Sequence, residues 1–204
     1  MKIGPKYKIA RRLGAHIFDK TQTQKFALSK ARRSEKEFKH RSFVKSDFGT
    51  GLIEKQRVRF YYGISERQFS RYAAEVIGKK ASKQEEGLYE KLERRLDNVV
   101  YRIGLAPSRR AARQMVSHGH ILVNGRRVKV PSYEVSAGDG ILVREGSRRR
   151  AIFSGLAERL KDKEMPYWLS FDPTRFEGKV NSLPAPSGRE TIFDLKAVIE
   201  FYKR

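Results

Sequence analysis

Residues 94–130 read RRLDNVVYRIGLAPSRRAARQMVSHGHILVNGRRVKV, which combines two helical patterns with a turn between short apolar runs. The first helix is expected to run up to Ile103, where a series of apolar side chains at helical spacing stops. A second helix is expected after Ser108, because a serine hydroxyl caps the free N–H groups of a helix start. Asn124 and Gly125 tolerate positive φ and predict a two-residue hairpin turn. The stretch therefore predicts a helix–helix–strand module.

The same patterns continue on both sides of this stretch. Leucine and valine recur from residue 88 to residue 103 and predict one apolar helix face that stops at Gly104, a residue typical of the helix C-cap. The hairpin strands are expected at 121–123 and 128–130, and a third strand is expected at 141–143. The module is thus expected to join an apolar helix to a small sheet.

The second helix of the module separates its cations from its apolar side chains. At 100° per residue, one face holds Ala111, Ala112, Met115 and Val116, and the opposite face holds Arg109, Arg110 and Arg113. Unpaired N–H groups at the helix start also attract an anion. We therefore predict that this face binds backbone phosphates. Further phosphate-binding candidates in the module are Arg94, Arg95, Arg126 and Arg127.

Residues 94–143 resemble the S4 RNA-binding domain. The family pattern is an arginine, Leu-Asp, an apolar helix, a glycine, then Ser-Arg-x-x-Ala-Arg-Gln and Val-Asn-Gly, and this chain matches it in order and spacing. The same domain occurs in pseudouridine synthases, tyrosyl-tRNA synthetases and a heat-shock protein. The resemblance therefore implies RNA binding but leaves the question of enzymatic activity to the rest of the chain.

Composition points to the same kind of partner. The chain has 204 residues, with 45 lysines and arginines against 23 acidic residues and a formal net charge of +22. Such a charge repels itself unless a polyanion neutralises it, which favours nucleic acid. No run approaches the roughly 18 apolar residues of a spanning helix, and the start has no apolar signal core, so we expect no membrane association and a cytoplasmic location. The lack of cysteine excludes disulfides, thiolate zinc sites and thiol nucleophiles.

Positive charge is concentrated in two blocks, and we divide the chain at their borders. Residues 1–46, with 14 basic and 3 acidic residues, are expected to form a basic N-terminal arm. Residues 94–150, with 13 basic and 4 acidic residues, are the RNA-binding module. Residues 47–93 and 151–204 each hold 9 basic and 8 acidic residues. We expect these neutral segments to form one helical domain that the module interrupts, giving an α+β fold.

The arm is rich in turn residues and cations. Few of its apolar residues repeat at a helix or strand period, so much of it is expected to be extended and to order only on RNA. Its aromatic residues Tyr7, Phe18 and Phe26 either pack on the protein body or stack on bases, and packing is the favoured alternative. The cations of the arm that we predict to bind RNA are Lys6, Lys8, Arg11 and Arg12.

The segment after the arm predicts two helices. A helical pattern over residues 53–78 is interrupted near Gly63, and Ser65 and Gln68 have the spacing of a capping box. Apolar residues then recur along one helix face, which we expect to be buried. The members of that face are Phe69, Tyr72, Ala73, Val76 and Ile77.

Nearly the whole chain resembles the uS4 family of ribosomal proteins. The matching motifs are Gly4-Pro5-Lys6, Arg11-Arg12-x-Gly14, Ser46-Asp47-Phe48-Gly49, Glu54-Lys55-Gln56-Arg57-Val58-Arg59, Tyr62-Gly63-Ile64-x-Glu66-Arg67-Gln68-Phe69, Pro166-x-Trp168-Leu169 and Val198-Ile199-Glu200-Phe201-Tyr202. The resemblance implies a protein that binds 16S ribosomal RNA early in small-subunit assembly. It also implies a place beside protein uS5 and other small-subunit proteins, with an influence on decoding accuracy.

This chain departs from the family pattern at two places, which concern zinc binding and contact with messenger RNA. Many members hold zinc through an N-terminal cysteine cluster that this chain lacks, so no metal is carried over. Members often have several arginines in the loop near the path of the messenger RNA. Here Arg41 and Lys45 flank Phe43 and Val44, which weakens the implied contact with messenger RNA and the contribution to its unwinding.

No catalytic constellation is visible in the sequence. Gly49-Thr50-Gly51 and Gly138-Asp139-Gly140 begin like dinucleotide loops but lack the third glycine. His118 and His120 have no cysteine or acidic cluster nearby and are expected to pack or to touch phosphate. One rival reading is an RNA-modifying enzyme, for which residues 151–204 would have to be catalytic. Another is a regulator that binds its own messenger or assists transcription.

The C-terminal segment is expected to contact protein rather than RNA. Its net charge is close to zero, and aromatic residues are enriched in the cores of interfaces. The alternative is that these aromatic residues close the domain. The residues concerned are Trp168, Phe171, Phe176, Phe193 and Phe201.

Overall fold

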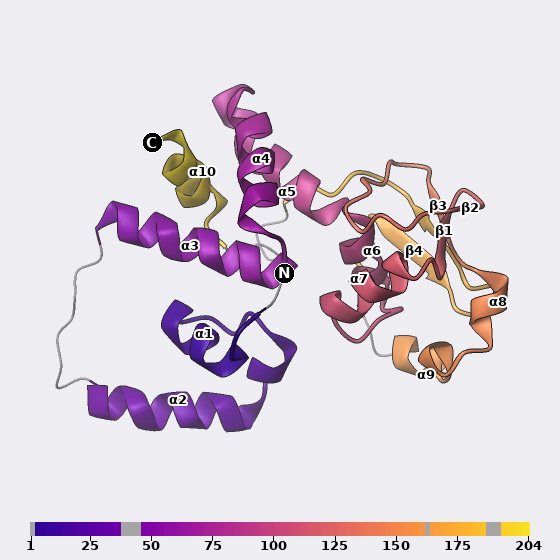
Figure 1. Cartoon of the computed structure of the whole chain (residues 1–204), viewed down its shortest axis with the longest axis horizontal. Helices are drawn as coiled ribbons and strands as arrows, with labels where there is room; N and C mark the ends of the chain where they lie inside the picture. Colours follow the sequence, from indigo (N-terminus) through magenta and orange to yellow (C-terminus); the bar gives the residue numbers. More distant parts are fainter. Residues whose placement is uncertain (1–2, 38–45, 162–163, 187–192) are drawn as a thin grey trace. The chain divides into compact units, whose positions relative to one another are not determined.

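The computed structural model describes residues 3–37, 46–161, 164–186 and 193–204, which fold as two compact units (Figure 1). Unit 1 comprises Met1–Glu85 together with Gly188–Arg204, and unit 2 comprises Glu86–Ser187. The fold class is α+β, as predicted, because unit 1 is helical and unit 2 combines helices with a sheet.

Unit 2 contains an antiparallel sheet with the strand order β2-β1-β3-β5-β4. The strands are β1 (Ile121–Val123), β2 (Arg126–Arg127), β3 (Gly140–Val143), β4 (Leu169–Asp172) and β5 (Glu177–Val180). The predicted turn between β1 and β2 is confirmed, because Asn124 and Gly125 have φ of 50° and 77°. The predicted strand at 128–130 is wrong. Pairing ends at Arg127, and the chain then turns away toward Tyr133, whose carbonyl accepts the N–H of Leu96.

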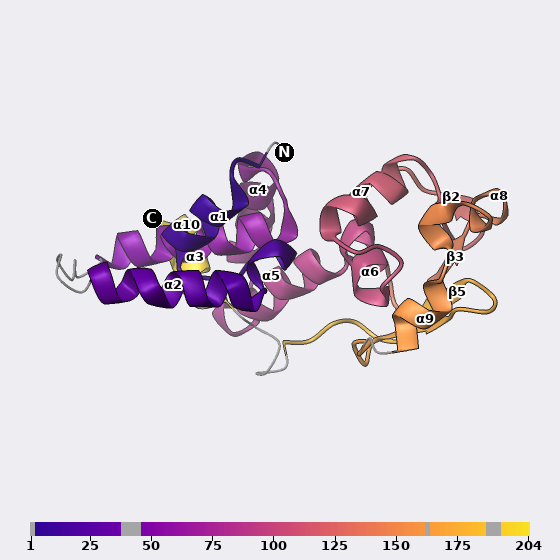
Figure 2. The ribbon, with the colours of Figure 1, turned by 90° about the horizontal axis from the view of Figure 1, so that it is seen from below.

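The helices of unit 2 are α5 (Gln84–Glu93, which starts in unit 1), α6 (Leu96–Ile103), α7 (Arg109–Ser117), α8 (Glu145–Arg148) and α9 (Leu156–Lys161), with a 3-10 turn at Ala151–Phe153. The C-cap at Gly104 is confirmed by its φ of 99°. The expected single helix over 88–103 is broken, because Arg95 is extended and bridges to Glu134. This break lets α6 take its own direction and pack against α7 (Figure 2).

The core of unit 2 explains why the charge-based domain borders were wrong. Trp168 is 1% exposed and packs with Ile103, Ile121 and other apolar side chains of the module. Strand β5 also pairs with β3, so residues 151–186 complete the module and do not return to the helical part. The chain passes from one unit to the other at residues 85–86 and again at 187–188, where net charge gives no signal.

Unit 1 is built from α1 (Lys6–Leu13), a 3-10 turn (Asp19–Thr21), α2 (Gln24–Glu37), α3 (Asp47–Tyr62), α4 (Glu66–Ile77), a 3-10 turn (Ala81–Lys83) and α10 (Leu195–Lys203). Ser65 caps α4 as predicted by accepting the Gln68 N–H at 3.3 Å, while the Gln68 side chain reaches Tyr72 instead of the cap. Helix α10 packs on α3 and α4. Phe69, Tyr72, Ala73 and Val76 are buried, as the helical pattern predicted, whereas Ile77 is only partly buried.

The N-terminal segment is not the extended arm that the sequence predicted. Over the described residues 3–37 it forms α1 and α2, and its apolar residues make a core of their own with α3. Phe18 and Phe26 are 6% and 4% exposed, so packing is the correct alternative for both. The sequence shows no clear helical periodicity here, because the six buried side chains come from α1, the following turn and α2 together. No single helix contributes enough of them to form a long apolar face. These side chains are Ile9, Ala10, Leu13, Ile17, Phe18 and Phe26.

Candidate nucleic-acid interface

Helix α7 carries the strongest phosphate-binding prediction. Ser108 caps it as expected, with its Oγ accepting the Ala111 N–H at 3.2 Å. Ala112, Met115 and Val116 are buried, which turns the opposite face outward. Arg110 is exposed on this outer face, whereas Arg109 and Arg113 are partly buried. The structure therefore brings the three predicted arginines onto one helix surface but exposes them unequally.

Arg113 and Arg95 both bind the carboxylate of Asp97 on α6. Arg95 donates from Nε and Nη2 at 3.0 and 2.8 Å, and Arg113 donates from Nε and Nη2 at 2.9 and 2.7 Å. Arg95 and Asp97 are 1% and 3% exposed. Arg95 is therefore structural, and its prediction as an RNA-binding residue is wrong. No acidic residue stands on α7 itself, but Asp97 reaches Arg113 from α6.

A second buried acid, Glu93, anchors the other side of α6. It is 0% exposed and accepts bonds from Asn98 Nδ2 at 2.9 Å and from Arg102 Nη2 at 2.7 Å. Asn98 in turn accepts from Arg109 Nε at 2.9 Å, and the Arg109 guanidinium lies 4.3 Å from the centre of the Tyr101 ring. Arg109 is thus held in one orientation at the start of α7, where it is preorganised to meet an anion.

The remaining candidate arginines in the module differ in exposure and in how many protein groups bind their side chains. Arg94 binds the Val135 carbonyl at 2.7 Å and Glu90 at 2.7 Å, and its side chain is 20% exposed. Arg126 and Arg127 in the hairpin are exposed. Arg126 and Arg127 are therefore better placed for a ligand than Arg94.

The cations predicted in the N-terminal segment lie on α1. Lys8 and Arg12 are exposed, while Lys6 and Arg11 lie over the rings of Phe18 and Phe26 at 5.6 and 5.7 Å. These four side chains thus flank the small core of unit 1 on one helix. The loop residues Arg41, Phe43, Val44 and Lys45 lie outside the described residues.

Comparisons with known proteins match the chain to two families. The family described as S4 domain matches residues 94–141, and the family described as Ribosomal protein S4/S9 N-terminal domain matches residues 1–95. Proteins named small ribosomal subunit protein uS4 are similar over nearly their whole length. The relative from Limosilactobacillus reuteri is 39% identical, covering 98% of both chains. The relative from Chromobacterium violaceum is 42% identical, covering 99% of this chain and 98% of its own.

The chain belongs to the uS4 family of small ribosomal subunit proteins.

Membership of the uS4 family implies a structural role and not an enzymatic one. Among the described residues, no three acidic or histidine side chains gather as a metal site would require. No helix in this part of the chain is long and apolar enough to cross a bilayer. The S4 domain match ends at residue 141, so α8, α9, β4 and β5 extend the module beyond that family's pattern.

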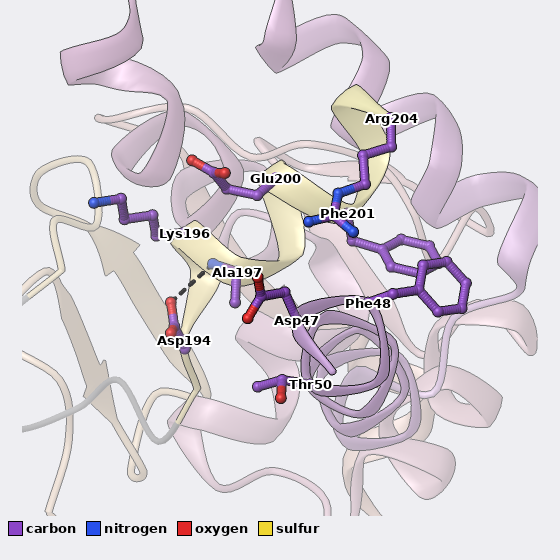
Figure 3. A pocket seen from close by; sticks show the side chains of 9 residues that line it. All are labelled: Asp47, Phe48, Thr50, Asp194, Lys196, Ala197, Glu200, Phe201 and Arg204. Carbon is purple, nitrogen blue, oxygen red and sulfur yellow. Dashed lines mark hydrogen bonds between the residues drawn. The ribbon is translucent and has the colours of Figure 1, made fainter. Parts of the chain in front are cut away.

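Unit 1 of this uS4 family member also has a pocket of about 290 Å³ between the start of α3 and α10 (Figure 3). Its lining mixes the acids Asp47, Asp194 and Glu200 with the cations Lys196 and Arg204. The rings of Phe48 and Phe201 lie beside it with centroids 5.2 Å apart, and Phe48 is 52% exposed. An apolar ring beside a lining of three acids and two cations suits a protein surface better than RNA phosphates.

Helix α10 is fixed to the rest of unit 1 by a polar contact near this pocket. Tyr202 donates to Glu66 Oε1 at 2.9 Å, and Lys55 binds the same oxygen at 2.8 Å. Burial raises the pKa of Tyr202, and the bond to Glu66 raises it further. Burial opposes ionisation of Glu66, but hydrogen bonds from Lys55 and Tyr202 lower its pKa overall. The pocket is therefore a preformed feature of unit 1.

The C-terminal aromatic residues do not form one surface. Trp168, Phe171 and Phe176 belong to the core of unit 2, whereas Phe193 contacts Tyr61 with ring centroids 4.9 Å apart in unit 1. The expectation that the whole set contacts protein is therefore wrong for Trp168, which is buried. Phe201 is the member that reaches the pocket.

Proposed function

We propose that this chain binds 16S ribosomal RNA directly and does so early in small-subunit assembly. The observation that carries the proposal is the outer face of α7, where a capped helix start coincides with Arg109, Arg110 and Arg113. Backbone N–H groups and guanidinium groups there attract the same phosphates. The family name of its relatives, small ribosomal subunit protein, supports ribosomal RNA as the target.

The RNA is read mainly through phosphates, ribose and shape. The exposed candidates Arg110, Arg126, Lys8 and Arg12 are cations, and cations supply affinity but little base specificity. Arg109 and Arg113 contribute from fixed positions, since α6 holds both.

The test is to purify the tagged chain from its own cells and to sequence the RNA bound to it. We expect 16S ribosomal RNA in a molar amount equal to that of the protein. Replacing Arg110 with glutamine should flatten the plot of log affinity against log salt by roughly 0.7–0.9 if it contacts one phosphate. Arg67→Gln, an exposed arginine of the near-neutral segment, is the matched control. Co-purification of another RNA class, without 16S RNA, would contradict the proposal.

We further propose that the pocket between α3 and α10 receives protein uS5, and that this contact affects decoding accuracy. Support comes from the pocket lining, which holds three acids and only two cations, and from exposed Phe48 beside Phe201. Phe48→Ala should weaken binding to uS5 about tenfold, because a partly exposed ring that becomes buried is a typical interface anchor. Affinity for naked 16S RNA should not change.

Leu28→Ala is the control for this experiment, because Leu28 is 62% exposed on α2, away from the pocket residues. An equal loss of uS5 and RNA binding in Phe48→Ala would contradict a protein-specific pocket. The family resemblance implies messenger RNA as a further partner, although the apolar residues Phe43 and Val44 in the 41–45 loop weaken this implication. The proposed location is the ribosome of a bacterial cytoplasm or of an organelle.

A further inference from the structure

A second group of cations in unit 2 surrounds His120. This histidine lies between α7 and β1 and is 7% exposed. Its Nδ1 lies 2.9 Å from Oγ of Ser147, a buried residue of α8. The backbone N–H of Arg144 also donates to the His120 carbonyl at 2.8 Å. These bonds tie α8 to the start of β1 and give the region a fixed shape.

The cations come from separate elements and meet at this point. They are Arg127 in β2, Arg144 before α8 and Arg150 after α8, and His118 lies beside them after α7. Burial lowers the pKa of His120, and the charges of Arg150, His118, Arg127 and Arg144 lower it further. The His118 and His120 rings have centroids 6.0 Å apart.

Two backbone carbonyl groups hold the Arg127 side chain in this position. Its Nε donates to the Gly119 carbonyl at 3.1 Å, and its Nη2 donates to the His118 carbonyl at 2.9 Å. Gly119 has a φ of +71°, and a Cβ there would lie 2.1 Å from Arg127 Nε. Glycine at 119 therefore makes room for the guanidinium. The chain orients an exposed arginine with carbonyl groups, which leaves its charge unneutralised.

Among the described residues, no acid pairs with the three arginines of this group, Arg127, Arg144 and Arg150. Residues 144–150 hold four arginines and a single acid, Glu145. Gathered like charges raise the energy of the free protein unless an anion binds among them. Arginines spread over separate elements match successive phosphates of a strand better than one small anion.

We propose that the His120 cluster, defined as His118, Arg127, Arg144 and Arg150 around His120, is a second RNA-backbone binding surface of unit 2, distinct from α7. The proposal rests on the proposed function, since it assigns a further contact to the same RNA. Arg144 and Arg150 lie beyond residue 141, where the S4 domain match ends. The shared pattern of that domain therefore does not account for them.

The test measures affinity of the full chain for 16S ribosomal RNA over a range of salt concentrations. In the variant R127Q/R144Q/R150Q, we expect the slope of log affinity against log salt to flatten by about two, since each phosphate contact contributes roughly 0.7–0.9. Affinity at moderate salt should fall about tenfold or more. The control R67Q/K79Q/K80Q removes the same charge from exposed positions of unit 1 and should change the slope less.

A second variant separates RNA contact from structural damage. R144Q/R150Q keeps Arg127, and neither replaced side chain forms a hydrogen bond with a described residue, so the fold should persist. It should flatten the slope by about one and a half. The NMR signals of the His120 ring give a local readout, because a bound phosphate should raise the pKa of His120.

The outcomes distinguish the two proposals. If the wild type binds 16S RNA but both cluster variants match the unit 1 control in slope, the second surface is wrong. A loss of affinity with an unchanged slope also overturns it, since the arginines would then act through the fold. If the wild type does not bind 16S RNA with high affinity, the proposed function itself fails.

Discussion

Unit 2 uses arginine in two opposite ways. Around α6 and α7, Arg95 and Arg113 share the buried carboxylate of Asp97, and Arg102 is held by buried Glu93. In the His120 cluster, Arg127, Arg144 and Arg150 have no acidic partner among the described residues. The first group holds helices together, and the second is left for an anion from outside. An arginine in a basic segment therefore does not indicate by itself which anion it binds.

The two groups should differ most in what their loss does to the fold. A buried charge pair is costly to break from one side, because the remaining charge has neither water nor partner. An exposed arginine without a partner contributes little to stability. The two groups can therefore be separated by measuring stability and RNA binding on the same variants.

The largest effect is expected from Asp97→Asn. It would leave Arg95, which is 1% exposed, without its counter-charge and would also release Arg113. We expect a loss of about 3–5 kcal/mol in the free energy of unfolding, measured by urea titration of the full chain. Glu145→Gln, which removes an exposed acid of α8, is the control and should change stability by less than about 0.5 kcal/mol. A small change in the free energy of unfolding for Asp97→Asn would contradict the distinction between the two groups of arginines.

A pair of arginine variants should sharpen the comparison. Arg113→Gln removes charged hydrogen bonds to Asp97 and should cost about 1.5 kcal/mol of stability. Arg144→Gln should change stability by less than about 0.5 kcal/mol but flatten the salt dependence of RNA binding by roughly 0.7–0.9. Denaturation and RNA binding would be measured on both. Equal stability losses would mean that Arg144 has a structural partner.

The smallest effect concerns pH. Burial and nearby cations lower the pKa of His120, so the folded chain binds fewer protons than the unfolded chain between that pKa and the ordinary value of about 6.5. The free energy of unfolding should therefore decrease as the pH falls through about 6.5. His120→Gln should weaken this pH dependence of the free energy of unfolding. His118→Gln, which removes the neighbouring ring and keeps His120, is the control. Greater stability on acidification, with His120 intact, would contradict the assigned direction.

Much of the local structure could be predicted from short stretches of sequence. Ser108 caps α7, Gly104 ends α6, and Asn124 with Gly125 forms the turn, because each signal depends on a few neighbouring residues. The buried face of α4 also followed from helical spacing. The fold of the N-terminal segment could not be predicted in this way, since its core is assembled from α1, α2 and the turn between them.

The sequence by itself therefore determined the family, the α+β class, the helix caps and the excess of positive charge. Only the tertiary structure decided which arginines remain available to RNA. Asp97 meets Arg113 from 16 residues away, and Arg94 binds a carbonyl 41 residues away. The tertiary structure also decided that β5 pairs with β3, which keeps Trp168 in unit 2. Caps and turns depend on adjacent residues, whereas the charge partners depend on how distant segments pack, which no local pattern encodes.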